Sequence, residues 1–224
     1  MTMLQKHHAG LSRDEVRLYY NHRCQVSWLD DWYSSRAKAL ALKLFDPRPG
    51  QRLLEVGVGT GQCFVEILKR LQGQGELYGV DLSPEMVRLT NQRAAASGYS
   101  GYRVIEGAAD KLPFVDQSFD GVFCTYVLDL LPQQEIVQAL GEFQRILRPG
   151  GRVVLAGLTP GQCPFTRLTA WLWTFIYCRV PLAVGGCRPL SLAPYLRRRQ
   201  FAHLQRHYLV QRGVPSEIMV ASRL

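Results

Sequence analysis

Short apolar segments alternate with segments of helical periodicity through the first two thirds of the chain. Five apolar segments are predicted strands, at residues 52–56, 76–81, 102–106, 121–126 and 152–156. Helices are predicted at residues 61–71, from a cap at Ser83 to about Ala96, and at residues 133–147. Residues 149–151 (Pro-Gly-Gly) are predicted to turn the last of these helices into the fifth strand. This alternation is typical of a parallel sheet covered by helices on both faces, so the pattern predicts an α/β fold.

The end of the chain has a different pattern. A helix is predicted near residues 193–201, and extended segments at 204–210 and 217–221 flank a turn at residues 212–215. Two extended segments joined in this way indicate an antiparallel hairpin. A chain of 224 residues with 47% hydrophobic composition is sufficient for one compact domain. The sequence has no internal repeat or low-complexity tract that would indicate a second domain.

The segment LLEVGVGTGQ, residues 53–62, places three glycines at alternate positions between the first predicted strand and the first predicted helix. Glycines there let the backbone turn tightly and let a nucleotide-like ligand approach the main chain. The dinucleotide fingerprint G-x-G-x-x-G would require a glycine where this chain has Gln62, which argues against an NAD-dependent oxidoreductase. Glu55 favours a cationic amino group over a diphosphate, and Asp81 is placed to bind ribose hydroxyls. The two carboxylates indicate a ligand with a ribose at one end and an amino-acid zwitterion at the other.

The net charge of +9 arises entirely in the last third of the chain. Residues 1–150 hold 17 basic and 17 acidic residues, whereas residues 151–224 hold ten arginines and one acid, Glu217. The six cysteines form no C-x-x-C pair, no metal site is predicted, and the first ten residues lack the apolar core of a secretory signal. The longest apolar stretch, residues 168–184, contains Arg179 and Pro181 and is shorter than the roughly 20 residues of a membrane span. These features favour a cytoplasmic protein.

Five motifs carry a resemblance to a known family. They are EVGVGTG (55–61), GVDLSPEM (79–86), EGAADKLPF (106–114), SFDGVF (118–123) and LRPGG (147–151). Their order and spacing resemble the class I S-adenosylmethionine-dependent methyltransferases, and more closely the branch that contains the ubiquinone/menaquinone-biosynthesis methyltransferases. The resemblance implies a Rossmann-like sheet of seven strands, mostly parallel, with a C-terminal antiparallel hairpin and helices on both faces. It also implies one domain, with a helical lid (1–45), a cofactor-binding core (46–158), a substrate-covering insertion (159–192), and a terminal helix and hairpin (193–224).

The resemblance implies which residues would bind S-adenosyl-L-methionine and the product S-adenosyl-L-homocysteine. They are Tyr19, Glu55, Gly57, Gly59, Gly61, Asp81, Leu82, Met86, Ala109, Asp110 and Tyr126. Family members often have an aspartate that binds the adenine amino group where this chain has Ala108, so either Asp110 or the Ala109 backbone would replace it. This departure keeps open an alternative function, a non-catalytic binding or assembly subunit with the same fold.

Methyl transfer requires an acceptor aligned with the sulfonium methyl group and shielded from water. A base is needed only for a protonated acceptor, and the candidates for a base or an orienting residue are Tyr19, Tyr20, His22, Tyr126, Asp129 and His203. We select Tyr20, His22 and Asp129 as the catalytic candidates. In similar enzymes a lid tyrosine points at the methionine carboxylate, which draws attention to the segment LYYNHR (18–23). Asp129 has a second interpretation, as a cap of the helix that begins near Pro132.

The segment after the fifth strand carries the acceptor prediction. A helix there places Leu168, Trp171, Leu172, Phe175 and Ile176 on one face, and it places Trp173 and Tyr177 on the other. A helix that is apolar on nearly all sides is buried, inserted in lipid or covering an apolar ligand. With the arginines around it, this predicts a lipophilic acceptor: a quinone precursor, a phenolic or polyketide metabolite, or a phospholipid head group.

Two kinds of binding partner are in question, a membrane surface and a nucleic acid. Contact with an anionic membrane surface is one interpretation of the apolar helix and its arginines, and an ordinary lid with a solvated basic face is the other. A nucleic-acid substrate is disfavoured because TYVLDLLP (125–132) stands where enzymes that methylate base amines carry N-P-P-Y or D-P-P-Y. The sequence makes no prediction about the oligomeric state.

Overall fold

The computed structural model describes residues 10–22 and 27–224, with the backbone alone described for residues 27–31. Arg23, the last residue of the LYYNHR segment, and Cys24 lie outside the described residues. The elements in chain order are α2 (Arg13–His22), α3 (Ser27–Phe45), β1 (Arg52–Val56), α4 (Gln62–Leu71), β2 (Glu76–Asp81), α5 (Pro84–Ala96), β3 (Tyr102–Glu106), β4 (Phe119–Thr125), α6 (Gln133–Ile146), β5 (Leu147–Leu158), α7 (Pro164–Arg179), the 3₁₀ helix η1 (Pro181–Val184), α8 (Ala193–Arg198), β6 (Ala202–Gln211) and β7 (Val214–Ser222).

The seven strands form one sheet in the order β3-β2-β1-β4-β5-β7-β6. Strands β1 to β5 are parallel, and β7 runs antiparallel between β5 and β6. The predicted sheet of seven strands with a C-terminal antiparallel hairpin is therefore confirmed. The order of the strands reverses at β1, because β2 and β3 lie on one side of it and β4 and β5 on the other. The connections that leave the carboxyl ends of β1 and β4 therefore diverge and open a crevice between them.

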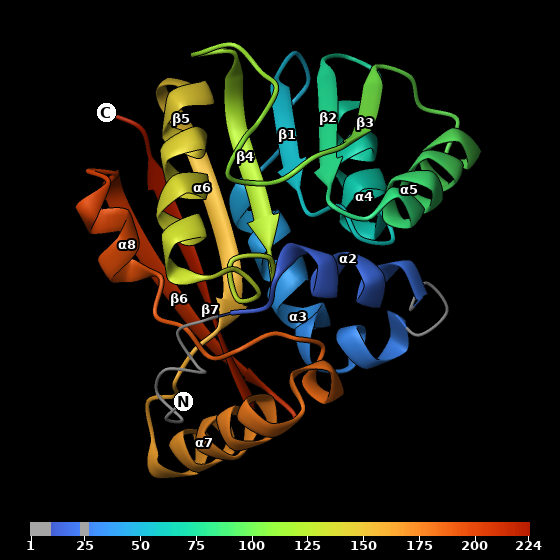
Figure 1. The fold of residues 1–224 in the computed structure, drawn as a ribbon. Helices are drawn as coiled ribbons and strands as arrows, with labels where there is room; N and C mark the ends of the chain where they lie inside the picture. The colour runs from blue at the N-terminus through green and yellow to red at the C-terminus, as the bar shows by residue number, and fades with distance from the viewer. Residues whose placement is uncertain (1–9, 23–26) are drawn as a thin grey trace.

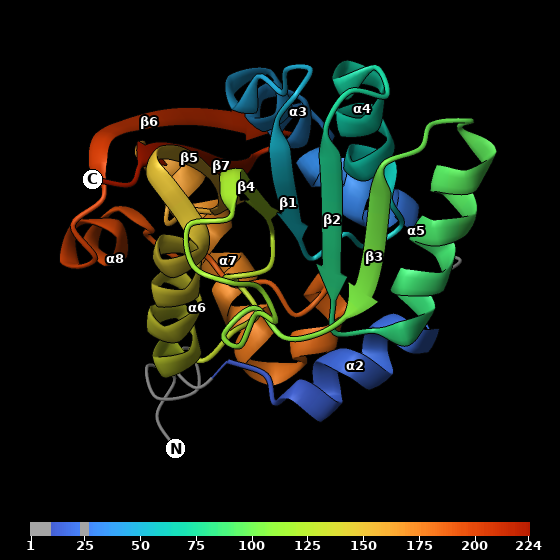
Figure 2. The same cartoon turned by 90° about the horizontal axis from the view of Figure 1, so that it is seen from above.

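Helices cover both faces of the sheet (Figures 1 and 2). Leu53 of β1 belongs to a buried cluster with Ile67 of α4 and residues of α3, on one face. Its neighbour Leu54 belongs to a second cluster with Phe143 of α6 and Leu196 of α8, on the other face. Successive residues of a strand point to opposite faces, so β1 is buried on both sides.

The start of β5 differs from the prediction. Strand β4 begins at Phe119, before the predicted residue 121, and β5 begins at Leu147 because Leu147 pairs with Phe119. The chain bends at the predicted residues, because Gly150 has a φ angle of 76° and the pairing with β4 is irregular between Leu147 and Arg152. The bend lies inside β5 rather than before it: the Gly150 N–H donates to the Arg223 carbonyl, and the Gly151 carbonyl accepts from the Arg223 N–H, each at 2.9 Å.

The C-terminal hairpin has a tighter turn than predicted. Arg212 and Gly213 alone form it, with φ angles of 51° and 83°, and positive φ at both central residues is the requirement of the type I′ hairpin turn. Val214 and Pro215 belong to β7. The terminal helix ends at Arg198, short of the predicted residue 201.

Two helical segments lie at the carboxyl edge of the parallel strands. Helix α2 crosses below the ends of β1, β2 and β4, and α7 lies further out, beyond β5 and the hairpin (Figure 1). The Thr169 hydroxyl of α7 donates to the carbonyl of Gly213 at the hairpin turn, at 2.7 Å. Within residues 10–22 and 27–224, no helix combines the length and apolarity needed to cross a membrane.

Candidate functional site

A cavity opens in the crevice between the carboxyl ends of β1, β2 and β4, under helix α2. It encloses about 1320 Å³, its open mouth included. Its wall includes Glu55, Gly57, Gly59, Asp81 and Tyr126, which the sequence predicts as cofactor-binding residues. A sheet with parallel strands binds its ligands at this edge, where the order of the strands reverses.

The three glycines of the loop after β1 have different tasks. All three adopt positive φ angles of 74° (Gly57), 51° (Gly59) and 81° (Gly61). A Cβ on Gly57 would lie 2.1 Å from the Val127 side chain, and a Cβ on Gly61 would lie 2.9 Å from the Thr90 hydroxyl, whereas a Cβ on Gly59 would meet nothing within 4 Å. Gly57 and Gly61 therefore permit close approach of protein neighbours, and Gly59 leaves backbone exposed to the cavity. Gly61 is not among the described residues that line the cavity.

The carboxylate of Asp81 connects the loops after β1 and β2. Its Oδ2 accepts from the Gly59 N–H, and its Oδ1 accepts from the Ser83 N–H, each at 2.9 Å. Burial raises the pKa of Asp81, and the amide hydrogen bonds oppose that rise. A carboxylate oxygen can accept more than one hydrogen bond, so Asp81 retains acceptor capacity toward the cavity after it has fixed the two loops.

Glu55 is the buried acid of the site. Its side chain is 2% exposed, and its Oε2 has no hydrogen-bond partner among the described residues. Burial raises the pKa of Glu55 well above its usual range, while the Lys38 ammonium lowers it and Asp81 raises it. A buried carboxyl oxygen without a donor is costly, and a ligand ammonium in the cavity would satisfy it. The chemistry of this wall therefore fits the amino-acid end of S-adenosylmethionine.

Leu82, Met86, Ala109 and Asp110 line another part of the cavity. The Met86 N–H donates to the Ser83 hydroxyl at 3.2 Å, which confirms Ser83 as the cap of α5. The Asp110 carboxylate forms an ion pair with Arg13 of α2. Asp110 is therefore bound to the helix above the cavity.

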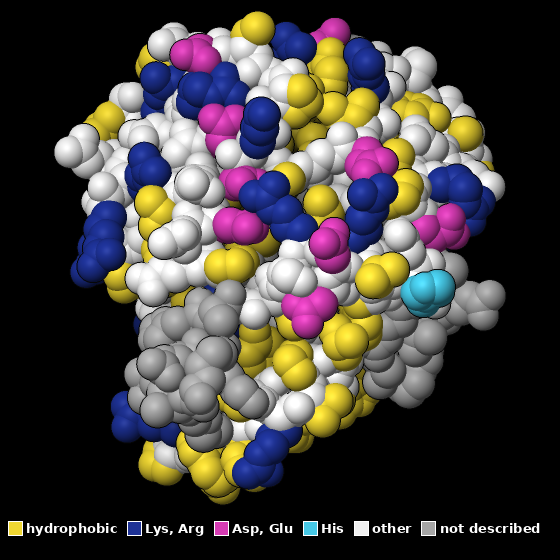
Figure 3. Space-filling model, viewed as in Figure 1, with side chains coloured by type: hydrophobic (Ala, Val, Ile, Leu, Met, Phe, Trp, Pro, Cys, Tyr) yellow, Lys and Arg dark blue, Asp and Glu magenta, His cyan; other side chains and the backbone are white. Residues whose placement is uncertain are grey.

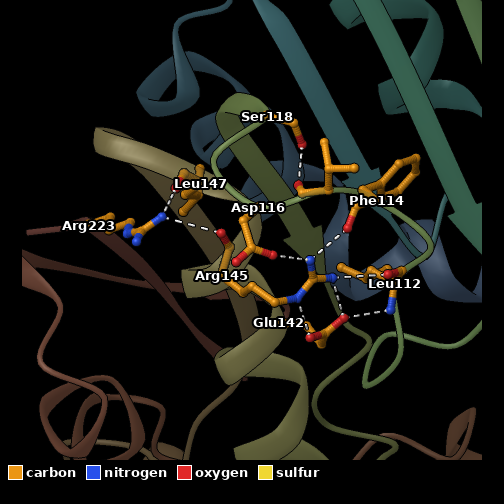
Figure 4. Close-up of polar contacts among 9 residues, drawn as sticks. Leu112, Phe114, Asp116, Ser118, Glu142, Arg145, Leu147 and Arg223 are labelled. Atoms are coloured by element: carbon orange, nitrogen blue, oxygen red, sulfur yellow. Dashed lines mark hydrogen bonds and ion pairs between the residues drawn. The ribbon is translucent and has the colours of Figure 1, made fainter.

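The segment after Asp110 is held in place by Arg145 at the end of α6 (Figure 4). The guanidinium donates to the carbonyls of Leu112 (3.1 Å) and Phe114 (2.6 Å) and pairs with Asp116 (2.7 Å). Glu142 accepts from Arg145 at 2.8 Å and also accepts from the Leu112 N–H at 2.8 Å. This network fixes the connection between β3 and β4, and with it the wall that Ala109 and Asp110 form.

The tyrosines predicted on the lid lie at different depths. Tyr20 lines the cavity, and its hydroxyl donates to the Gly185 carbonyl at 3.3 Å. The Tyr19 hydroxyl donates to the Leu182 carbonyl at 3.0 Å. Tyr19 and His22 are not among the described residues that line the cavity, and His22 is exposed.

Asp129 lies behind the cavity rather than on its wall. It is fully buried, its Oδ2 accepts from the Leu158 N–H at 2.7 Å, and it is not among the described lining residues. The buried Arg188 donates to the Asp129 carbonyl at 3.0 Å and to the Leu131 carbonyl. The other histidine candidate, His203, is exposed on β6.

Several cavity residues were not predicted from the sequence. Tyr33, Ser34 and Lys38 come from α3, and Cys187 comes from the segment after η1. The Tyr33 ring meets the Tyr126 ring edge-on with centroids 5.6 Å apart, and the Lys38 ammonium lies 6.0 Å from the Tyr126 centroid. The i, i+4 spacing of Ser34 and Lys38, beside the buried apolar stripe of α3, is the local signal that could have found them.

Tyr126 has an unusual backbone conformation at the end of β4. Its φ angle is 56°, and its hydroxyl lies 2.9 Å from the Ser216 hydroxyl of β7. Burial raises the pKa of Tyr126 above its usual value, so the ring serves as a neutral wall of the cavity. Positive φ in a bulky residue is costly and persists only where its surroundings hold it, which is common at functional sites.

The chain matches known proteins over this region. A family model described as a methyltransferase domain matches residues 53–151. The chain is 33% identical over 150 residues to the ubiquinone/menaquinone biosynthesis C-methyltransferase UbiE of Geotalea daltonii, an alignment that covers 66% of this chain and 62% of that protein. It is 30% identical over 189 residues to the demethylmenaquinone methyltransferase of Symbiobacterium thermophilum, which covers 81% of this chain and 72% of that protein. The chain therefore spans less than two thirds of the UbiE relative and more than two thirds of the other.

A solved structure shares the whole fold. The [4+2]-cyclase SpnF superposes with a TM-score of 0.75 at 17% identity, covering 96% of this chain and 97% of that one. At this identity the likeness concerns the fold alone, because one fold supports different reactions. The residues of the cavity, rather than the fold, bear on which reaction the protein performs.

Proposed function

Because this chain belongs to the class I S-adenosylmethionine-dependent methyltransferases, we propose that it transfers the methyl group of S-adenosylmethionine to a lipophilic small molecule. One observation carries the proposal. At the cavity wall, the buried Glu55 carboxyl group has an oxygen to which no described residue donates a hydrogen bond, and nothing lies within 4 Å of the Cβ position of Gly59 on the same wall. A ligand that brings an ammonium group to this wall satisfies the carboxyl group.

The cavity residues divide the ligand between them. Glu55 would bind the ammonium group, Asp81 would accept from the ribose hydroxyls with its remaining lone pairs, and Leu82 and Met86 would pack against the adenine. Ala109 and Asp110 would flank the adenine edge, with Asp110 also bound to α2 through Arg13. In this assignment Gly57 and Gly61 support the loop, Tyr126 forms part of the wall near the amino-acid end, and the Tyr19 hydroxyl attaches α2 to η1 through the Leu182 carbonyl.

When bound, S-adenosylmethionine supplies an activated methyl group on its sulfonium. The cavity wall also includes Val16, Tyr20, Tyr33, Leu130 and Leu131, and these side chains would favour an apolar acceptor and exclude water. Lys38 brings a positive charge to the same space and would stabilise an acceptor that reacts as an anion, such as a phenolate. A quinone precursor or a phenolic metabolite meets both requirements.

The catalytic candidates are not equally supported by their positions. Tyr20 lines the cavity, and we propose that it orients the acceptor. His22 is exposed, and Asp129 is fully buried outside the described cavity wall, so neither side chain is placed to remove a proton from a bound acceptor. We therefore assign Asp129 a structural role and Lys38 the electrostatic one.

The test is calorimetric titration with S-adenosylhomocysteine and with 5′-methylthioadenosine, which keeps the adenine and ribose but lacks the amino acid. A hydrogen bond to a charged group contributes about 1.5–3 kcal/mol, so Glu55→Gln should weaken S-adenosylhomocysteine binding roughly 10- to 150-fold. It should leave 5′-methylthioadenosine binding within a factor of three. Glu66→Gln, at an exposed glutamate of α4, is the matched control and should change neither affinity.

An activity assay then separates the enzyme from the alternative subunit function. Phenols with alkyl chains of increasing length are incubated with S-adenosylmethionine, and the S-adenosylhomocysteine formed is measured. Turnover that rises with chain length would support the lipophilic acceptor. Equal Glu55→Gln and wild-type affinities for S-adenosylhomocysteine would contradict the site assignment, and binding without turnover on any acceptor would favour the non-catalytic subunit.

A further inference from the structure

Helix α7 turns one of its two apolar faces to the outside of the molecule. Phe165, Leu168, Trp171, Leu172 and Ile176, hereafter the α7 face, are between 43% and 62% exposed. Their spacing of three and four residues places them on one side of the helix. The sequence pattern left open whether this helix is buried or exposed, and the structure assigns burial to the opposite side.

The opposite side is firmly attached to the protein. Tyr177 is 2% exposed, and the Trp173 indole N–H donates to the Cys187 carbonyl at 2.9 Å. The Trp173 ring also meets the Tyr33 ring edge-on with centroids 5.1 Å apart. Because these contacts and the Thr169–Gly213 hydrogen bond fix the rotation of the helix, the α7 face stays outward.

The charge around the α7 face is positive. Arg167 and Arg179 of α7 and Arg212 at the hairpin turn are all exposed. The one acid of residues 151–224, Glu217, is fully buried and pairs with Arg206 at 2.6 Å. Figure 3 shows hydrophobic and basic side chains gathered together in the lower part of the molecule, where α7 lies.

We propose that the α7 face binds the surface of an anionic lipid bilayer. Contiguous exposed apolar side chains mark interaction sites, and a helix with an apolar face and basic flanks can lie in the interface of a membrane, with its apolar side chains among the acyl chains. The arginines select the partner, because they attract the negative surface of the bilayer and no exposed acid in residues 151–224 opposes them.

The position of α7 relates this surface to the cavity. Helix η1 follows α7, and the carbonyls of Leu182 and Gly185 accept from the Tyr19 and Tyr20 hydroxyls of α2, the helix that covers the cavity. Cys187, whose carbonyl holds Trp173, lines the cavity itself. A lipid surface on the α7 face thus lies next to the cavity cover. The binding itself goes beyond the proposed methyl transfer and requires neither cofactor nor acceptor.

The experiment measures co-sedimentation of the protein with vesicles of phosphatidylcholine alone and of phosphatidylcholine with phosphatidylglycerol. Binding is expected to the anionic vesicles and to weaken with salt. Each basic residue at such a surface contributes about a fivefold gain in affinity, so Arg167→Gln with Arg179→Gln should bind roughly 25-fold more weakly. Arg197→Gln with Arg198→Gln removes the same charge from α8 and should change binding less than threefold.

The apolar part of the face has its own variants. Trp171→Glu should weaken vesicle binding at least tenfold, and Val115→Glu, at an exposed valine before β4, is the matched control that should retain it. Trp171→Phe should bind vesicles as the wild type does but lose most of the blue shift of tryptophan emission that insertion produces. Equal binding to both vesicle types, or no binding to either, would overturn the proposal. A dimer in light scattering that Trp171→Glu dissociates, without vesicle binding, would instead assign the face to a second copy of the chain.

Discussion

The buried carboxyl group of Asp129 makes the stability of the protein depend on pH in an unusual direction. Asp129 is fully buried, and its Oδ1 has no hydrogen-bond partner among the described residues. Burial raises the pKa of Asp129 from 3.8 to about 8, although the Leu158 N–H and the Arg188 charge lower it. The folded protein therefore keeps a proton on Asp129 at neutral pH.

The sign of the effect follows from the order of the two pKa values. Between pH 4 and pH 8 the folded state holds the proton and the unfolded state has lost it, so the free energy of unfolding falls as pH rises. The stabilisation is complete below the unfolded pKa and is lost as pH approaches the folded pKa. One proton changes the free energy of unfolding by about 1.36 kcal/mol per pH unit, which amounts to roughly 2.7 kcal/mol between pH 5 and pH 7.

Asp129→Asn removes the pH-dependent contribution of Asp129 to the free energy of unfolding, because the amide is neutral at every pH and has nearly the same shape. We expect the wild type to lose roughly 2.7 kcal/mol relative to the variant between pH 5 and pH 7, whatever constant offset the amide introduces. Urea unfolding of both proteins at pH 5, 6 and 7 measures the difference, and Glu55, which is present in both, cancels. Asp116→Asn, at an exposed aspartate, should show no such trend. A wild-type minus Asp129→Asn difference that stays constant with pH would mean that Asp129 is ionised beside Arg188, and would refute the reasoning.

Three further predictions concern the cavity. The pKa of Glu55 is raised and a ligand ammonium would lower it, so S-adenosylhomocysteine binding should release a proton and strengthen as pH rises. Calorimetric titrations in buffers of different ionisation enthalpy should detect the proton release, and Glu55→Gln should abolish it. Arg13→Ala removes the two ion pairs that hold α2 over the cavity, and since such pairs contribute about 0.2–1 kcal/mol each, dissociation of S-adenosylhomocysteine in stopped flow should accelerate roughly two- to thirtyfold. Gly57→Ala should destabilise the fold by about 2 kcal/mol or more, because its Cβ would lie 2.1 Å from Val127. Gly59→Ala should cost the fold only about 1 kcal/mol but weaken S-adenosylhomocysteine binding more than tenfold, and equal effects of the two glycine variants would contradict the division of tasks in the loop.

Three of the five parallel strands could be predicted to the residue. β1, β2 and β3 have the predicted bounds because each is a short apolar run bounded by glycines or polar residues. The start of β5 could not be predicted, since Gly150 has the positive φ angle of a turn, and the bend lies within β5 because Leu147 pairs with Phe119 and Arg223, at the far end of the chain, is hydrogen-bonded to Gly150 and Gly151. A distant partner decides that boundary, and local pattern carries no information about it.

The cavity residues were likewise predictable only where their signal is local. The cofactor-binding candidates Glu55, Gly59 and Asp81 come from β1, the loop after it and the end of β2, and each lies in a short sequence motif. Tyr33, Lys38 and Cys187 come from α3 and from the segment after η1, and they reach the cavity only through the packing of these elements. For α7, composition indicated two apolar sides but could not say which one is buried, because the contacts of Trp173 and Tyr177 that decide it lie outside the helix.

The two sides of α7 therefore give two separable functions to one helix. Trp173 contributes to the inner side, through Tyr33 and the Cys187 carbonyl, and supports the cavity wall. Trp171 contributes to the outer side, is 55% exposed, and is not among the described residues that line the cavity. A change at Trp171 should alter vesicle binding and leave S-adenosylhomocysteine affinity unchanged, whereas Trp173→Leu should weaken S-adenosylhomocysteine binding and leave the outward face intact. If both variants affected both properties equally, the helix would act as a single rigid cover, and the outward face would owe its apolar character to the fold rather than to a membrane.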